Sequence, residues 1–172
     1  MNVYQNIIAV LLYISFSTMT LASPQTQVIE LGTATKGGGF ELFGNTLVEV
    51  VNATDSSVKL KPFPTKGSKQ NLKLLAQGKI VLGLVEGNAA RQALDGIGRD
   101  KLDMKVLSVM YPNPGMFVVR ADSRYHRIED LKGQPIAFGT RASGLRILVN
   151  DVLDGLGLDH AKDFQQIILD KA

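Results

Sequence analysis

The chain has 172 residues, and its 19 Lys and Arg against 16 Asp and Glu give a formal net charge of +3. This mild excess is not the clustered basic face of a nucleic-acid-binding protein. The absence of cysteine excludes a disulfide framework, a thiolate metal site and a cysteine nucleophile.

The first residues have the pattern of a secretory signal. The stretch MNVYQNIIAVLLYISFSTMTLASPQ carries no charged side chain. Its apolar core, Ile7 to Phe16, is about 10 residues long, as in a signal peptide, whereas a membrane span needs about 20. Thr20-Leu21-Ala22 offers a cleavage site, so we predict a signal peptide over residues 1–22 and a periplasmic mature chain without direct membrane insertion. An uncleaved N-terminal anchor stays the alternative, because no Lys or Arg precedes the apolar run.

Strand and helix patterns alternate in the next part of the chain. Short apolar runs bounded by turn residues predict strands at residues 28–31, 57–63 and 80–85. Apolar side chains at helical spacing predict helices at residues 40–52, 68–77 and 88–93, the second with Ser68 as its N-cap. Connections of this length join parallel strands, because such strands need a crossover.

From Met104 onward the pattern changes. Two apolar runs, separated by a short turn at residues 112–115, predict two strands without a helix between them. A short helix (IEDLKG), a buried strand (PIAFG), a helix ending at Gly155 and a last strand (FQQIIL) follow. We therefore predict an α/β protein of two βαβ lobes, residues 23–111 and 112–172. We expect the second lobe to be incomplete, because no covering helix follows its last strand.

Four loops leave the carboxyl ends of the predicted strands, and three of them combine glycine with a hydroxyl or a cation. They read GTATKGGG, TKGS, EGN and GTRASG. Ligands of open parallel sheets bind at this edge, where helix N-termini favour anions. Three interpretations compete: a small anionic solute, a nucleotide phosphate, or tight turns with capping hydroxyls and solvated cations.

Motif spacing weakens the nucleotide interpretation. A phosphate loop needs Lys and then Ser or Thr after its second glycine, but Gly38 and Gly39 follow Gly37. The dinucleotide fingerprint fails because Leu42 stands where its third glycine is required. The convergence of several such loops at one edge favours a small anionic solute.

Patterns of catalytic and metal-binding residues are sparse. His126 and His160 fall in loops beside charged residues, which is typical of solvated side chains. Ser143 is not in a nucleophile elbow, because Arg141 stands where a glycine is required. The paired carboxylates fall on helices with polar neighbours. We therefore predict a binding protein without enzymatic activity, cofactor or metal.

The motifs LGTATKGGGFELFGNTLVEVVN, TKGSKQNLKLLAQGKIVLGLVEGNAA, YPNPGMFVVRADS, IEDLKGQPIAFGTRASG and VLDGLGLD resemble the solute-binding subunit of TRAP transporters of the TAXI type. The resemblance covers the chain from about Val28 to its end. It implies a periplasmic-binding-protein-like bilobal clamp, in which a solute lies between the lobes and a membrane permease receives it. Members of that family are longer, so the resemblance also implies that this chain is truncated at its C-terminus. The resemblance therefore implies a partial or non-functional fragment of such a receptor.

The resemblance further implies an acidic solute, such as a glutamate-like amino acid or a 2-oxo dicarboxylate, and a set of contacts from both lobes. The implied contacts are Thr35, Lys36, Gly38, Gly39, Phe40, Thr65, Lys66, Gly67, Ser68, Glu86, Asn88, Pro112, Thr140, Arg141, Ser143 and Gly144. The family pattern has smaller residues where this chain has Lys36. A ligand-sensing domain that signals to a partner protein, or an enzyme on the same scaffold, are the alternative functions.

Overall fold

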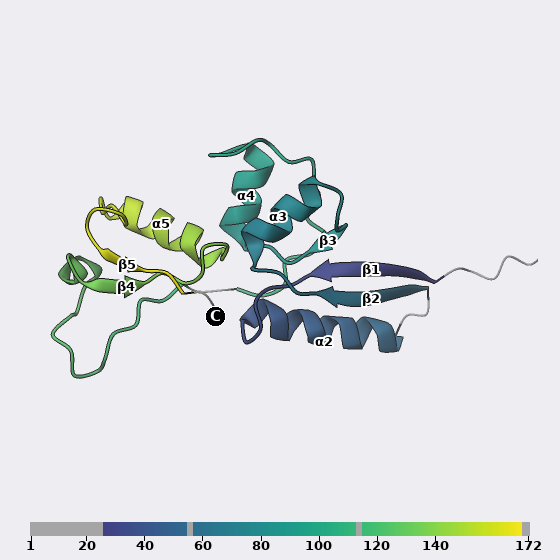
Figure 1. Ribbon diagram of the computed structural model, residues 1–172, viewed down its shortest axis with the longest axis horizontal. Coiled ribbons are helices and arrows are strands. Elements are labelled where there is room, and N and C mark those ends of the chain that lie inside the picture. Colours follow the sequence, from purple (N-terminus) through teal and green to yellow (C-terminus); the bar gives the residue numbers. More distant parts are fainter. Residues whose placement is uncertain (1–25, 55–56, 113–114, 170–172) are drawn as a thin grey trace, which may run out of the picture.

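A computed structural model describes residues 26–54, 57–112 and 115–169 of the chain (Figure 1). The predicted signal peptide, residues 1–22, lies outside the described residues. Within the described ranges, no helix combines the length and apolar character needed to cross a membrane.

The first sheet has three parallel strands in the order β2-β1-β3. They are β1 (Gln27–Gly32), β2 (Val58–Phe63) and β3 (Leu82–Gly83). The helices are α2 (Gly39–Thr54), α3 (Ser68–Ala76) and α4 (Gly87–Asp95). In Figure 1, α2 lies on one side of this sheet and α3 and α4 lie on the other. The predicted α/β class with parallel strands is confirmed.

Helix α2 packs closely on the sheet because its inner face carries a glycine. A Cβ added at Gly44 would lie 2.5 Å from Cγ2 of Thr33, so only glycine allows the observed approach. One turn further along, Val48 joins a buried cluster with Leu31, Leu60 and Leu84. This cluster joins α2 to β1, to β2 and to the residue that follows β3.

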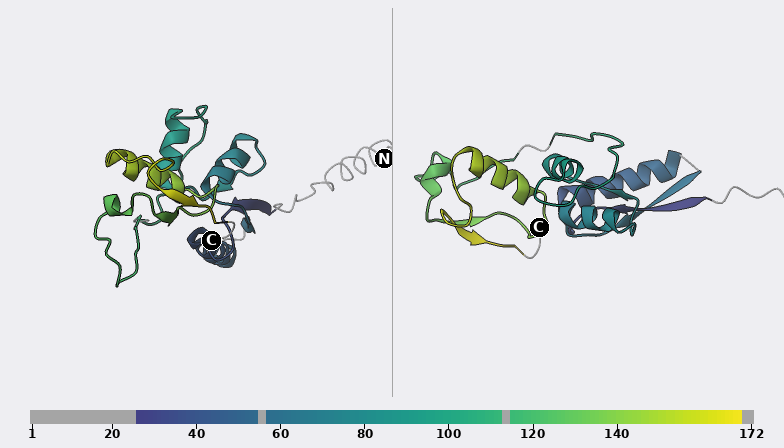
Figure 2. Two further views of the ribbon diagram at one scale, coloured as in Figure 1. Left: turned by 60° about the vertical axis from the view of Figure 1, so that its left-hand side comes forward. Right: turned by 90° about the horizontal axis from the view of Figure 1, so that it is seen from above.

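A second, smaller unit follows. Its elements are the 3₁₀ helix η1 (Ile128–Leu131), β4 (Pro135–Ala137), α5 (Leu145–Gly155) and β5 (Gln165–Ile167). Strands β4 and β5 pair in parallel, and α5 covers one face of the pair (Figure 1). Val149 and Leu153 of α5 are buried against Phe138 and Phe164, whose rings meet edge to face with centroids 6.0 Å apart. The two units lie side by side along the long axis, with the start of α5 at their junction (Figure 2).

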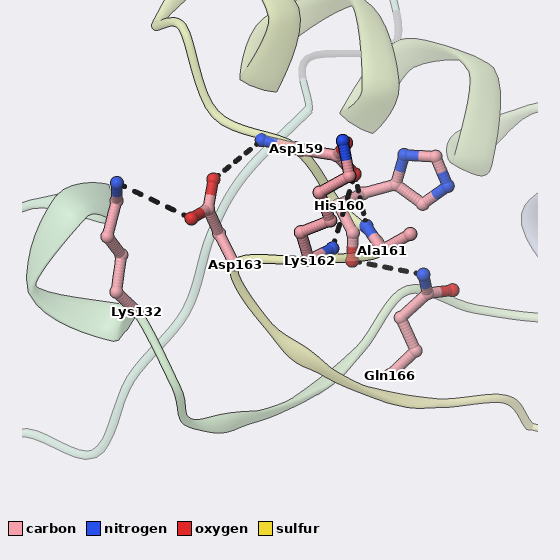
Figure 3. Close-up of polar contacts among 7 residues, drawn as sticks. All are labelled: Lys132, Asp159, His160, Ala161, Lys162, Asp163 and Gln166. Atoms are coloured by element: carbon pink, nitrogen blue, oxygen red, sulfur yellow. Dashed lines mark hydrogen bonds and ion pairs between the residues drawn. The ribbon is translucent and has the colours of Figure 1, made fainter.

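Carboxylates order the loop between α5 and β5 (Figure 3). The carboxylate of Asp159 accepts hydrogen bonds from the amides of Ala161 and Lys162, at 2.8 and 3.2 Å. The amide of Ala161 is the main cause of the lowered pKa of Asp159. Asp163 in turn accepts from the amide of Asp159 at 2.7 Å and lies 3.5 Å from the ammonium of Lys132. These acidic groups stabilise a turn.

Two predictions of local structure are wrong. The two strands expected after Met104 do not form: the described residues of the range 104–119 belong to no helix or strand. Ser68 is not the N-cap of α3. That position belongs to Gly67, whose φ of 107° lies in a region that favours glycine. The third strand is also shorter than expected, since only Leu82–Gly83 pairs.

Candidate functional site

The loop between β1 and α2 begins with buried residues, and the residues that follow them are half-buried or solvent-exposed. Gly37 has a φ of 87°, which lets the chain reverse, and the amide of Gly38 donates to the carbonyl of Thr35 at 3.0 Å. Lys36 and Gly39 are exposed, and Phe40 is half-buried. The glycine run therefore forms a tight turn that presents an ammonium group at the start of α2.

The loop between β2 and α3 is tied to the first loop through the hydroxyl of Thr65. This hydroxyl donates to the carbonyl of Thr33 at 3.0 Å and accepts from the amide of Gly67 at 3.1 Å. Lys66 between them is exposed. The Thr65 side chain is 94% buried in this role, with a relative exposure of 6%. Its hydroxyl therefore stabilises the backbone here and is already engaged.

Glu86 caps the next helix. Its two carboxylate oxygens accept from the amides of Asn88 and Ala89 at the start of α4, both at 3.0 Å. Its own amide donates to the hydroxyl of Ser68 at 3.0 Å, which joins the third loop to the second. The capping carboxylate also offsets the positive end of the α4 dipole.

The loop of the second unit, residues 140–144, lies directly on the first unit. The amide of Lys69 donates to the carbonyl of Ala142 at 3.2 Å. A Cβ added at Gly144 would come within 2.6 Å of both Glu86 Cβ and Ser68 Oγ. The small size of Gly144 therefore allows this contact between the units.

A buried asparagine that the sequence analysis missed holds the strand ends in place. The side-chain amide of Asn71, on α3, donates to the carbonyls of Gly32, Thr33 and Leu84 at 3.1, 2.8 and 2.7 Å. The side chain has 0% exposure. Asn71 lies three residues after Ser68 and four before Leu75, on the face of α3 that turns to the sheet, and this spacing is the signal that could have revealed it.

Most of the expected contact residues are thus brought together, and their environments differ. The loops at Thr33 to Phe40, Thr65 to Ser68, Glu86 to Asn88 and Thr140 to Gly144 form one connected set through the contacts above. Ser68 and Thr140 are buried, whereas Ser143 is half-buried and its hydroxyl accepts from the amide of Leu145 at 3.1 Å. Pro112 is exposed, and it follows Tyr111, whose ring lies 5.2 Å from that of Phe43.

Three cations stand out on these loops. Lys36, Lys66 and Arg141 are exposed, and none of them forms an ion pair with a residue that the structure describes. Glu86 is the carboxylate among the expected contacts, and its oxygens already accept from α4. These three exposed side chains, on loops of both units, form what we call the cationic rim. The rim has more free positive than negative charge, which suits an anion.

Two cavities adjoin this connected set of loops. One, of about 490 Å³, is bordered by Phe40 and Glu86 together with apolar residues of α4 and of the segment 106–111. The other, of about 480 Å³, lies between the units. Its polar lining residues, absent from the expected contacts, are Lys69, Gln92, Arg99, Asn150, Asp151 and Asp154. In the described part of the chain, no group of three or more His, Asp or Glu residues is placed to hold a metal.

Comparison with protein families matches most of the chain to a described family. The model of a family described as NMT1-like matches residues 31–171, which is all of the chain except its first 30 residues and the last one.

Proposed function

The chain belongs to the NMT1-like family, a periplasmic-binding-protein-like family, and on that premise we propose that it is a TAXI-type receptor of a TRAP transporter. In this proposal it captures a small anionic solute, either a glutamate-like amino acid or a dicarboxylate, and delivers it to a TRAP-type permease. The signal peptide over residues 1–22 directs it to the periplasm, and the lobes correspond to residues 23–111 and 112–172.

The observation that carries the proposal is the cationic rim. Lys36, Lys66 and Arg141 come from three loops of both units, and these loops are connected by short contacts rather than spread over the surface. An anion placed among them would meet charge-assisted donors, which form stronger hydrogen bonds than neutral ones. Because Arg141 belongs to the second unit, its contribution would require both units to face the same solute.

Calorimetric titration with L-glutamate and 2-oxoglutarate tests this proposal. We expect saturable binding of at least one of them, and Arg141→Ala should weaken it by about 1.5 to 3 kcal/mol, the range for a hydrogen bond to a charged group. Lys79→Ala is the matched control, because Lys79 is also exposed but lies beyond the far end of α3. If the two variants bind with equal affinity, Arg141 is a solvated surface residue that does not contact the solute. If neither compound shows saturable binding, this choice of solute is wrong.

The proposed location has its own test. N-terminal sequencing of the protein from a periplasmic extract should begin at Ser23, and Ala22→Arg should block processing by removing the small residue before the cleavage site. A periplasmic protein that begins at Met1 would show that the N-terminal segment is retained.

A further inference from the structure

A cavity of about 480 Å³ lies where α5 of the second unit faces α3 and α4 of the first. None of the described residues that line it is among the contacts expected for an anionic solute. Its volume falls in the range of about 300 to 1,000 Å³ that is typical of small-molecule sites. The cavity is therefore a candidate binding site of its own, and its lining residues decide which chemistry it suits.

The floor of this cavity is apolar and is shared by the two units. Leu72 of α3 and Ala89 of α4 are buried, with relative exposures of 2% and 1%. Ile147 of α5 packs against the cluster that contains them. Asp151 and Asp154 follow Ile147 by four and seven residues, so they lie on the same side of the helix. One stripe of α5 therefore supplies part of the apolar floor and an acidic side of the cavity.

The two sides of the cavity carry opposite charges. Lys69 and Arg99 line it from the first unit, and no carboxylate of that unit joins them in the described lining. Asp151 and Asp154 line it from the second unit. All four residues are exposed, and none forms an ion pair with a residue that the structure describes. Cations on one side and carboxylates on the other are thus both available to a ligand.

Two neutral amides complete the polar lining. Gln92 lies on α4 and Asn150 lies on α5, and both residues are half-buried. An amide side chain offers N–H donors and a carbonyl acceptor, which match the acceptor and donor of a peptide group. The cavity therefore combines an apolar floor, two amides and two oppositely charged sides.

We propose that this cavity binds a short peptide with free termini, a di- or tripeptide. Its carboxylate lies against Lys69 and Arg99, and its ammonium group lies against Asp151 and Asp154. The two amides pair with its peptide groups, and the apolar floor accepts the rest of the molecule. A ligand with a single charge would leave one charged side without a partner. Charge complementarity therefore selects a molecule that carries both charges at opposite ends.

Calorimetric titration with triglycine tests the ligand class. We expect saturable binding of triglycine, and weaker binding of N-acetyltriglycine and of triglycine amide, because each lacks one terminal charge. 8-Aminooctanoate has the same chain length and both charges but no peptide group, so it should also bind more weakly. A lack of saturable triglycine binding would overturn the proposal, and so would equal binding of either blocked peptide. Equal binding of 8-aminooctanoate would show that the ligand is not a peptide.

A matched pair of variants tests the location. Asp151→Asn should weaken triglycine binding on the order of tenfold, as expected for the loss of a hydrogen bond to a charged group. Glu49→Gln is the control, because it also removes one exposed helical carboxylate, from α2 on the other side of the first sheet. If the two variants bind triglycine equally well, the peptide does not occupy this cavity.

Melting curves without peptide distinguish a ligand site from a direct contact between the two charged sides. Asp151 has no ion pair with a described residue to lose, so Asp151→Asn and Glu49→Gln should both melt at the wild-type temperature. A lower melting temperature of Asp151→Asn alone would show that its carboxylate pairs with the first unit, which would overturn the proposal. The residues of this cavity are not among the proposed contacts of the anionic solute, so the binding of triglycine and the receptor function are tested separately.

Discussion

Replacing Asn71 by alanine should destabilise the first unit, because this one side chain joins α3 to the ends of β1 and β3. Its two N–H groups are shared among the carbonyls of Gly32, Thr33 and Leu84. Two of these acceptors keep another partner after the substitution. Gly32 still accepts from the amide of Leu84, and Thr33 from the hydroxyl of Thr65. The carbonyl of Leu84 loses its side-chain donor.

The size of the effect follows from these contacts. The side-chain amide has only two N–H groups, so we count its three contacts as two full hydrogen bonds. At about 0.5 to 1.5 kcal/mol each, their removal costs roughly 1 to 3 kcal/mol. A buried polar atom without a partner costs about 1 to 3 kcal/mol. The new cost at Leu84 is offset by the removal of Asn71 Oδ1, which is buried without a hydrogen bond in the described structure. We therefore expect a loss of about 2 kcal/mol in the free energy of unfolding.

Urea denaturation followed by circular dichroism measures this loss. Asn45→Ala is the matched control, because Asn45 is also helical but makes a single side-chain bond, to Glu41 at 2.8 Å, four residues away. Such a pair contributes about 0.2 to 0.5 kcal/mol. If Asn71→Ala and Asn45→Ala have the same midpoint, the buried amide does not hold the strand ends together.

Three further predictions concern other contacts. Gly44→Ala should lower stability, because overpacking against the sheet typically costs about 1 to 3 kcal/mol and outweighs the gain of about 1 kcal/mol in helix propensity. Gly155→Ala is the control and should not lower stability, because a Cβ there would meet nothing within 4 Å. Glu86→Ala removes the cap of α4 and should cost about 0.5 to 2 kcal/mol in a thermal melt; an unchanged melting temperature would contradict the capping role. Backbone amides lower the pKa of Asp130, so its stabilising contribution is full above the usual carboxyl pKa of about 3.9 and is lost as the pH falls through the lowered value. Asp130→Asn should therefore reduce the acid sensitivity of the urea midpoint, and an unchanged pH profile would exclude this origin.

The first unit could be predicted from the sequence because its signals are local. Periodicity placed α2 and α3, and the crossover lengths made the strands parallel. The position of Asn71 on the inner face of α3 could also be predicted from its spacing. Its three acceptors could not, because they lie at strand ends that are 13 to 39 residues away in sequence.

The segment after Met104 shows the opposite case. Its apolar runs predicted two strands, but the described residues of the range 104–119 form none. A strand exists only where another strand completes the hydrogen-bonded ladder, and local sequence does not show whether such a partner is present. The candidate site shows a similar limit. Glycine, hydroxyl and cation were expected to face a solute together, but the hydroxyl of Thr65 is engaged by the backbone. The cation Lys66 beside it is exposed, and the sequence alone does not separate these roles.

The hydrogen bond from the amide of Lys69 to the carbonyl of Ala142 allows motion between the two units to be measured by hydrogen exchange. This amide is at the start of α3, where no residue of the helix itself can accept from it. Its protection from hydrogen exchange therefore depends on the second unit staying in contact. A single backbone hydrogen bond contributes only about 0.5 to 1.5 kcal/mol, so thermal fluctuations should break it often. The exchange rate of this one proton would measure how frequently the units separate, without any label or ligand.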